Sequence, residues 1–309
     1  MKIFTKALLT SSLSVSLLAS GLMGTTQTHA AKASDISIMV NNETPKLDVS
    51  PYIKNGATLV PLSAIKSIPD VTISWDNKMK VVTVTNDNEK STLKAGSKEA
   101  KINGDKVALP NASEMKNGRI MVPIRFITDA SDAYAYWNSA QRIVYVAKPS
   151  DDLKKDLQSS DTATSRNAAI RFPTVDRLGA LLESSKGDNM VYTTYFSKNK
   201  VDEFMKKHLD VVNYYRIIDG RAELVWTARL DLDHKAKNAN LPIVEYKILE
   251  SKGKMPVNPT GGVYFSYSLP GGVQYGTIDK NGKATELPTA TAEQSDKGIF
   301  DIPEEEQLK

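Results

Sequence analysis

The chain has 309 residues and a mass of 33.9 kDa, which is more than one ordinary domain and suits two once a leader and a tail are set aside. Its hydrophobic content of 40% and charged content of 25% exclude collagen-like, wholly disordered and polytopic membrane proteins. The absence of cysteine excludes disulfides, thiolate metal sites and a cysteine nucleophile. The small net charge of +4 gives no electrostatic case for nucleic acid as a partner.

Residues 1–30 have the pattern of a secretory signal peptide. Two lysines precede an uncharged run of apolar, small and hydroxylated residues from Ala7 to Gly24. Small residues favour cleavage after Ala30, with Ala33 as the alternative. A retained membrane anchor is the rival interpretation, but serines interrupt the run, which is short for a membrane span. We therefore expect a secreted protein of the Gram-positive type, extracellular or cell-wall associated, with no membrane attachment after cleavage.

An internal repeat is the strongest pattern in the chain. A shift of 62 positions aligns two segments without a gap. The aligned structural residues are Gly56 with Gly118, Pro61 with Pro123, and Trp75 with Trp137. Each copy predicts an Asn-Gly turn, a strand that ends in Val-Pro, a short helix and two further strands. The expected helices are 62–67 and 124–130, and the expected strands after them are 72–75, 80–85, 134–137 and 142–147.

A copy of this length buries little surface alone, so we expect the two copies to share one core. Each copy is expected to contribute its own small antiparallel sheet with one helix. Trp75 and Trp137 are the expected centres of the core, because a large aromatic residue followed by a turn usually closes a hydrophobic layer. The alternative is that these tryptophans are exposed and bind sugars.

The repeat pair resembles the stalk-type copper amine oxidase N-terminal-like domains of secreted Gram-positive proteins. The resemblance rests on Asn-Gly-x-x-Leu-Val-Pro-Leu at 55–62 and its counterpart at 117–124, and it covers about residues 36–148. It implies antiparallel sheets packed around short helices, serving as an extracellular spacer or interaction module. Family units carry an arginine two residues after the proline, which Arg125 matches and Ser63 does not. Arg125 is therefore a candidate binding residue.

The resemblance implies no amine oxidase activity, because it covers only the accessory stalk of those enzymes. Their reaction needs three histidine ligands to copper, and only His208 and His234 remain after the leader. We expect no cofactor.

The second half is expected to be a separate α+β domain. Residues 149–169 predict a charged linker that is helical in part, 170–288 the domain, and 289–309 an acidic flexible tail. Apolar residues three and four apart predict helices at 175–184 and 200–209, with Ser197 as a cap. The expected strands are 190–196, 214–218, 221–232, 243–249, 262–269 and 273–279, with Asp219-Gly220 and 279–282 as hairpin turns. The predicted fold class is thus α+β, a tandem stalk-type repeat followed by two helices and an antiparallel sheet.

Two clusters in the second half are candidate sites. Asp231, Asp233 and His234 lie at the end of a predicted strand and could bind a hard cation such as calcium, although a solvated strand end is the favoured interpretation. The other cluster comprises Tyr264, Phe265 and Tyr267, whose rings could stack on sugars, although burial in a core is favoured.

No G-x-S-x-G, G-x-x-x-x-G-K or H-E-x-x-H motif occurs. We therefore expect a non-catalytic, envelope-associated protein whose repeat pair is a spacer or binding module for a cell-wall polymer or another extracellular protein. Two rival interpretations stay open. One is an extracellular hydrolase of envelope polymer with its site in residues 170–285, and the other is a purely structural matrix protein.

Overall fold

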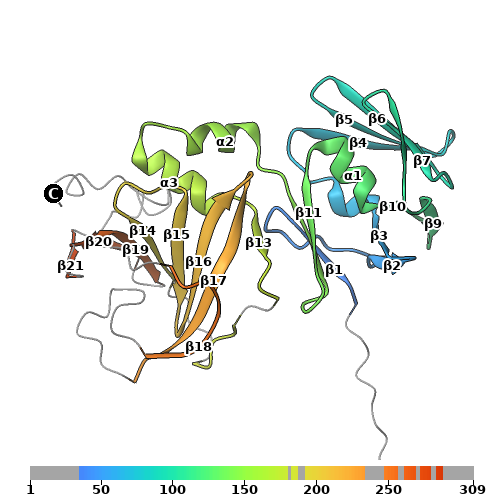
Figure 1. Ribbon diagram of the computed structural model, residues 1–309. Helices are drawn as coiled ribbons and strands as arrows, with labels where there is room; N and C mark the ends of the chain where they lie inside the picture. The colour runs from blue at the N-terminus through green and yellow to red at the C-terminus, as the bar shows by residue number, and fades with distance from the viewer. Residues whose placement is uncertain are drawn as a thin grey trace, which may run out of the picture. The chain divides into compact units, whose positions relative to one another are not determined.

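The computed structural model describes residues 35–179, 182–186, 192–233, 247–256, 261–268, 272–279 and 283–287 (Figure 1). These residues form an α+β fold, as predicted. Residues from Asp35 onward group as one compact unit. None of the helices in the described ranges is long and apolar enough to cross a bilayer. The expected signal peptide and acidic tail lie outside these ranges.

The two copies of the repeat meet at strands β3 (Ala57–Pro61) and β10 (Arg119–Pro123), which pair antiparallel. Val60 lies opposite Val122, its own repeat equivalent. The pairs on either side are also exchanged by the repeat: Leu59 with Pro123 and Pro61 with Met121. A pseudo-twofold axis therefore passes through the Val60–Val122 pair.

Three sheets make up the repeat pair, and each contains strands from both copies. The first is β2 (Tyr52–Lys54), β3, β10 and β9 (Glu114–Lys116). The second is β1 (Ser37–Val40), β12 (Ile143–Ala147) and β11 (Tyr134–Asn138). The third is β4 (Val71–Asp76), β5 (Val81–Asn86), β6 (Glu89–Lys94), β7 (Glu99–Ile102) and β8 (Asp105–Ala108).

The expectation of a separate small sheet for each copy is wrong, because the copies exchange strands. β1 opens the first copy, yet it pairs in parallel with β12, which closes the second. β7 opens the second copy, yet it pairs with β6 of the first. Burying the apolar face of each short sheet requires strands that one copy alone does not supply.

The local turns and helix starts follow the sequence. The 3₁₀ helix η1 (Leu62–Ile65) and helix α1 (Ile124–Ser131) begin directly after the two prolines, whose φ of −65° and −58° suits a helix start. The glycines of both Asn-Gly turns have φ +76°, the left-handed backbone that such a hairpin turn requires. Asp132 ends α1 with a left-handed φ of 53° and donates its N–H to the carbonyl of Thr128.

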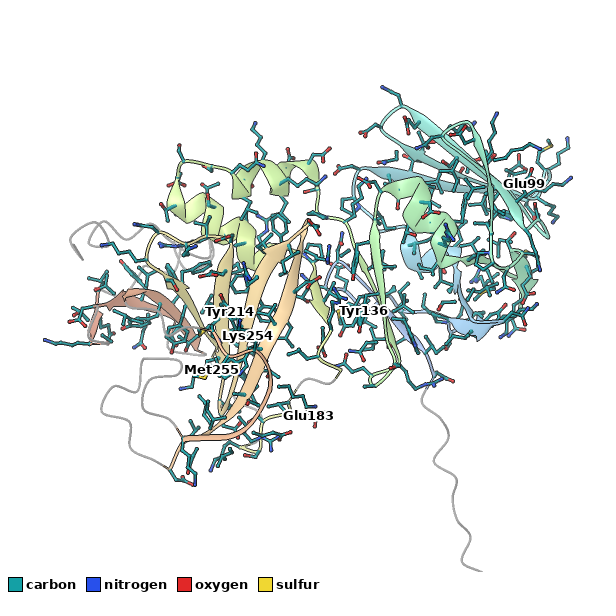
Figure 2. The ribbon with its side chains drawn as sticks, viewed as in Figure 1. Glu99, Tyr136, Glu183, Tyr214, Lys254 and Met255 are labelled. Atoms are coloured by element: carbon teal, nitrogen blue, oxygen red, sulfur yellow. The ribbon has the colours of Figure 1, made fainter. Side chains whose placement is uncertain are left out.

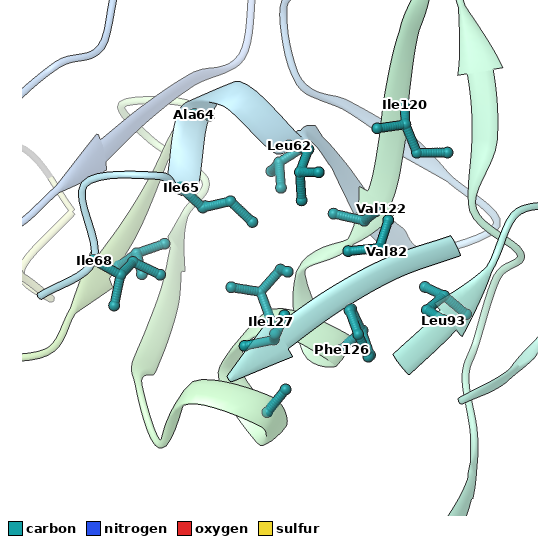
Figure 3. Packing of buried hydrophobic residues seen from close by; sticks show 14 of the residues in the cluster. Leu62, Ala64, Ile65, Ile68, Val82, Leu93, Ile120, Val122, Phe126 and Ile127 are labelled. Carbon is teal, nitrogen blue, oxygen red and sulfur yellow. The ribbon is translucent and has the colours of Figure 1, made fainter. Parts of the chain in front are cut away.

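One core serves both copies, as predicted. Phe126 and Ile127 of α1 pack with Leu62 and Ile65 of η1, and Val82 of β5 belongs to the same cluster (Figure 3). Phe126 is completely buried. The helical side chains occupy the centre of this core, where the sequence predicted the tryptophans.

Trp75 and Trp137 lie at the margin of the core, so their predicted central place is wrong. Both rings are half-buried and pack against the cluster. The reason is topological, because β4 and β11 are the edge strands of their sheets and no further strand covers the outer side of either ring.

The second half contains a sheet in the order β13 (Thr174–Asp176), β17 (Arg221–Asp231), β16 (Val211–Ile218), β15 (Glu203–His208), β14 (Tyr192–Ser197), β19 (Gly262–Ser268), β20 (Gly272–Ile278) and β21 (Ala284–Glu286). β18 (Lys247–Gly253) also pairs with β17. The pairing is antiparallel except between β13 and β17. The predicted hairpin at Asp219-Gly220 is confirmed, and Asp279 and Lys283 are bonded across the turn between β20 and β21.

Helices α2 (Asp151–Leu157) and α3 (Thr162–Arg171) lie side by side and pack on one face of this sheet (Figure 1). Ala168 and Ala169 of α3 are buried against Phe196 and Phe204 of the sheet. The segment expected to be a linker, 149–169, thus contributes to the core of the second half.

Both helices predicted after it are wrong. In place of 175–184, Val175 lies in the short strand β13 and is buried against Tyr145 and Ala147 of β12. In place of 200–209, the chain forms β15, and Ser197 ends a strand and caps no helix. Phe204 and Met205 are both buried, one on each face of the sheet. Burial on both faces removes the alternation that identifies a strand.

Replacing Phe126 by alanine tests the shared core. We expect Phe126→Ala to lower the free energy of unfolding by about 3–5 kcal/mol, because the ring fills the contact between the two copies. Ile53→Ala, at a side chain that is 46% exposed, is the control and should change it by less than about 0.5 kcal/mol. Urea unfolding followed by circular dichroism measures both, and equal effects would contradict the shared core.

Candidate functional site

A hollow of about 470 Å³ lies beside Trp75. It is bounded by η1, by the edge strand β4 and by the turn that opens β10. The residues that line it are Leu62, Ser63, Lys66, Ile73, Ser74, Trp75, Gly118, Arg119 and Ile120. The first six belong to the first copy of the repeat and the last three to the second, so the hollow exists only because the copies interlock.

The hollow combines an aromatic wall with hydroxyl groups and cations. The Trp75 ring is half-buried and Ser63 also lines the hollow, whereas the side chain of Ser74, the residue before Trp75 in β4, points to the other face of the sheet. Lys66 and Arg119 supply positive charge, and the Lys80 Nζ lies 6.0 Å from the centroid of the Trp75 ring. A large ring with a polar rim and few placed charges is typical of a ligand site.

Arg119 has one acidic neighbour. Its guanidinium donates to Asp48, and this bond holds the pKa of the Asp48 carboxyl below its usual range. Both side chains are more than half exposed. Water and salt therefore screen the pair, which contributes little to stability.

The pseudo-twofold counterpart of the hollow, around Trp137, differs in charge. Thr128 stands where the first copy has Lys66, and Ala57 stands where the second copy has Arg119. Arg125 replaces Ser63, but it forms an i,i+4 ion pair with Asp129 at 3.3 Å. Its charge is therefore balanced locally.

The outer face of the sheet that contains β11 and β12 is aromatic. Tyr134, Tyr136 and Tyr145 lie on this face and pack around Val175 of the second half. Their repeat equivalents are Thr72, Ser74 and Thr83, which are small and polar. This difference between the copies is a sequence signal for a docking face, and our sequence analysis missed it.

Two arginines, each stacked on a tyrosine ring, fix the contact between the repeat pair and the second half. The Arg221 guanidinium lies 3.8 Å from the centroid of the Tyr134 ring, and its Nη2 donates to the Oε1 of Glu223 at 2.6 Å. The Arg177 guanidinium lies 5.3 Å from the centroid of the Tyr136 ring, which is labelled in Figure 2. Its Nη1 is 3.4 Å from the same Glu223 oxygen. One carboxylate thus anchors two cations, each seated on a tyrosine of β11.

Amide side chains close the same junction. Asn138 donates to the carbonyl of Asp176 at 3.0 Å, and Asn42 donates to the carbonyl of Phe172 at 3.0 Å. Burial raises the pKa of Tyr145 to about 12, and the nearby Asp176 carboxyl adds to the effect. The junction is therefore specifically bonded, and Tyr145 is buried within it.

A second hollow, of about 640 Å³, opens at this junction. Lys148, Lys154 and Arg221 line it, but Lys148 donates to Asn86, Lys154 pairs with Asp151, and Arg221 pairs with Glu223. Each of these cations thus has a partner within the protein, and the Arg221–Glu223 pair is buried.

The tyrosine-rich candidates do not form a surface. Tyr264 and Phe265 are 4% and 6% exposed and lie on opposite faces of the sheet, Tyr264 with Trp226 and Phe265 with Phe196. Their placement among the candidate binding residues is wrong, and the favoured alternative of core burial is correct. The backbone of Tyr267 pairs with Tyr192, and its side chain lies outside what the structure describes.

The remaining candidates are dispersed. Arg125 is exposed on α1, where it pairs with Asp129 one helical turn further along. Asp233 donates its N–H to the Asp231 carboxylate and lies 3.6 Å from Lys186, while His234 lies outside the described ranges. Among the described residues, no three His, Asp or Glu side chains gather into a metal-binding group.

Residues 39–146 match the family model of the copper amine oxidase N-terminal domain. This range corresponds to the repeat pair, from within β1 to within β12. The chain has no significant match among the curated proteins or among the solved structures.

Neutralising Glu223 tests the junction. We expect Glu223→Gln to lower the free energy of unfolding by about 3 kcal/mol, because the buried Arg221 would lose its nearest counter-ion and keep only the exposed Asp219, 3.7 Å away. Glu250→Gln is the matched control, since Glu250 pairs with Arg229 at 3.6 Å on the surface, and should cost less than about 1 kcal/mol. Thermal unfolding of the two variants compares them, and a Glu223→Gln variant as stable as the control would contradict the anchoring role.

Proposed function

We propose that the protein is secreted and non-catalytic and that its repeat pair, which matches the family model of the copper amine oxidase N-terminal domain at residues 39–146, binds a cell-wall polymer of the bacterial envelope. The observation that carries the proposal is the half-buried Trp75 ring, which lines a hollow together with Ser63. The sequence pattern of residues 1–30 supports an extracellular location.

The hollow suits a sugar of such a polymer. The face of an indole ring accepts the apolar face of a sugar, and Leu62, Ile73 and Ile120 extend this apolar wall. The Ser63 hydroxyl can exchange hydrogen bonds with sugar hydroxyls. A volume of about 470 Å³ lies within the range of ligand sites, roughly 300–1,000 Å³.

The junction gives this binding module a consequence for the second half. With Glu223 anchoring two arginines on Tyr134 and Tyr136, the second half is held against the repeat pair by specific bonds. A wall polymer bound beside Trp75 would therefore retain the second half at the wall as well. The repeat pair would serve both as binding module and as spacer.

The two tryptophans provide a test with an internal control. We expect Trp75→Ala to abolish retention of the protein lacking residues 1–30 on purified Gram-positive cell wall, while Trp137→Ala is retained like the unmodified protein. Each substitution should cost roughly 2 kcal/mol of stability, since both rings are half-buried at the margin of the same core. Co-sedimentation measures retention, and unfolding curves show that both variants are folded.

If Trp75→Ala does not fold, Trp75→Leu keeps the apolar contact with the core and removes the stacking face. Equal retention of all variants would contradict the proposal. Soluble wall fragments released by the unmodified protein would instead support the rival hydrolase.

A further inference from the structure

We infer that the Trp75 hollow selects an anionic polymer, a glycan or polyol chain that carries repeated phosphate or carboxylate groups. This inference rests on the proposed function and names its ligand class. It is based on the cations near the Trp75 ring, which the stacking of a neutral sugar does not require.

Three positive side chains lie in or beside the hollow. Lys66 and Arg119 line the hollow, and Lys80 approaches the Trp75 ring from its own turn. They come from three separate segments, η1, β10 and the β4–β5 turn, so the fold alone brings them together. The chain as a whole has nearly balanced charge, with 40 basic and 36 acidic residues, so this convergence is local.

The two copies differ in which of the equivalent positions carry a charge. The backbone around Trp137 is related to that around Trp75 by the same axis and is built without a charge at two of the equivalent positions, Thr128 and Ala57. Lys80, by contrast, has a cationic equivalent in Arg142, and Ser63 is replaced by Arg125, which pairs with Asp129. A lysine and an arginine at Lys66 and Arg119 are therefore not required by the fold. Repeated anionic groups on the ligand would give both a role.

The acidic neighbour of Arg119 does not prevent this. The Asp48–Arg119 pair is exposed, and water and ions can take over the contacts of Asp48 at little cost. An arginine fork also binds phosphate or carboxylate through two parallel hydrogen bonds. A ligand anion can therefore share or replace Asp48.

The test compares intact Gram-positive wall with the same wall stripped of its phosphate polymers by cold hydrofluoric acid. We expect the Lys66→Gln, Arg119→Gln double variant to bind intact wall about tenfold more weakly than the unmodified protein, with a smaller loss at 0.5 M salt because charge interactions are screened there. Lys106→Gln is the matched control, an exposed lysine paired with Glu99 on a different strand pair, and should bind within about twofold of the unmodified protein.

Displacement by two competing polymers identifies which anionic group the protein recognises. Poly(glycerol phosphate) should displace the protein if phosphate is recognised, and polygalacturonate if carboxylate is recognised. Displacement by either polymer supports the inference. Equal binding of the double variant and the unmodified protein to both walls, with loss only in Trp75→Ala, would overturn the anionic ligand and leave the proposed function standing. No binding by any form would overturn both.

Discussion

The pairing of β3 with β10 at Val60 and Val122 is the constraint on which the rest of the repeat pair depends. Once a strand lies against its own repeat equivalent, the two copies are related by a twofold axis and cannot fold as separate units. α1 and η1 then meet in one core, β1 reaches β12, and β7 joins the strands of the first copy. The Trp75 hollow follows from the same constraint, because its walls come from both copies.

Within this symmetric frame, the side chains that face outward differ between the copies. The sheet of the second copy carries three tyrosines on its outer face where the first copy has threonine and serine, and those tyrosines receive the two arginines of the second half. The hollow of the first copy instead carries Lys66 and Arg119, where the second copy has Thr128 and the first has Ala57. Duplication thus produced two equivalent frames, and divergence of a few surface residues gave one of them a docking face and the other an open hollow.

The sequence predicted the features that short segments determine by themselves. The Asn-Gly turns and the proline starts of η1 and α1 depend on local backbone preferences, and each lies where it was expected. The shared core was also predictable, because a short repeat cannot bury enough surface alone.

What failed depended on partners distant in the sequence. The strand β15 has apolar side chains on both faces, and Phe204 and Met205 follow each other without the alternation of a surface strand. The parallel pairing of β1 with β12 joins residues more than one hundred positions apart. The Trp75 hollow was missed for the same reason, since Lys66 and Arg119 lie in different copies and no local motif connects them.

The most direct test of the account is a nuclear Overhauser measurement on the methyl groups of Val60 and Val122 in the folded protein. Residues directly opposite each other in an antiparallel pair have Cβ atoms about 5 Å apart, so a strong effect between these two valines is predicted. A methyl network in which each valine contacts only residues of its own copy would contradict the interlocked repeat, and with it the hollow that the copies build together.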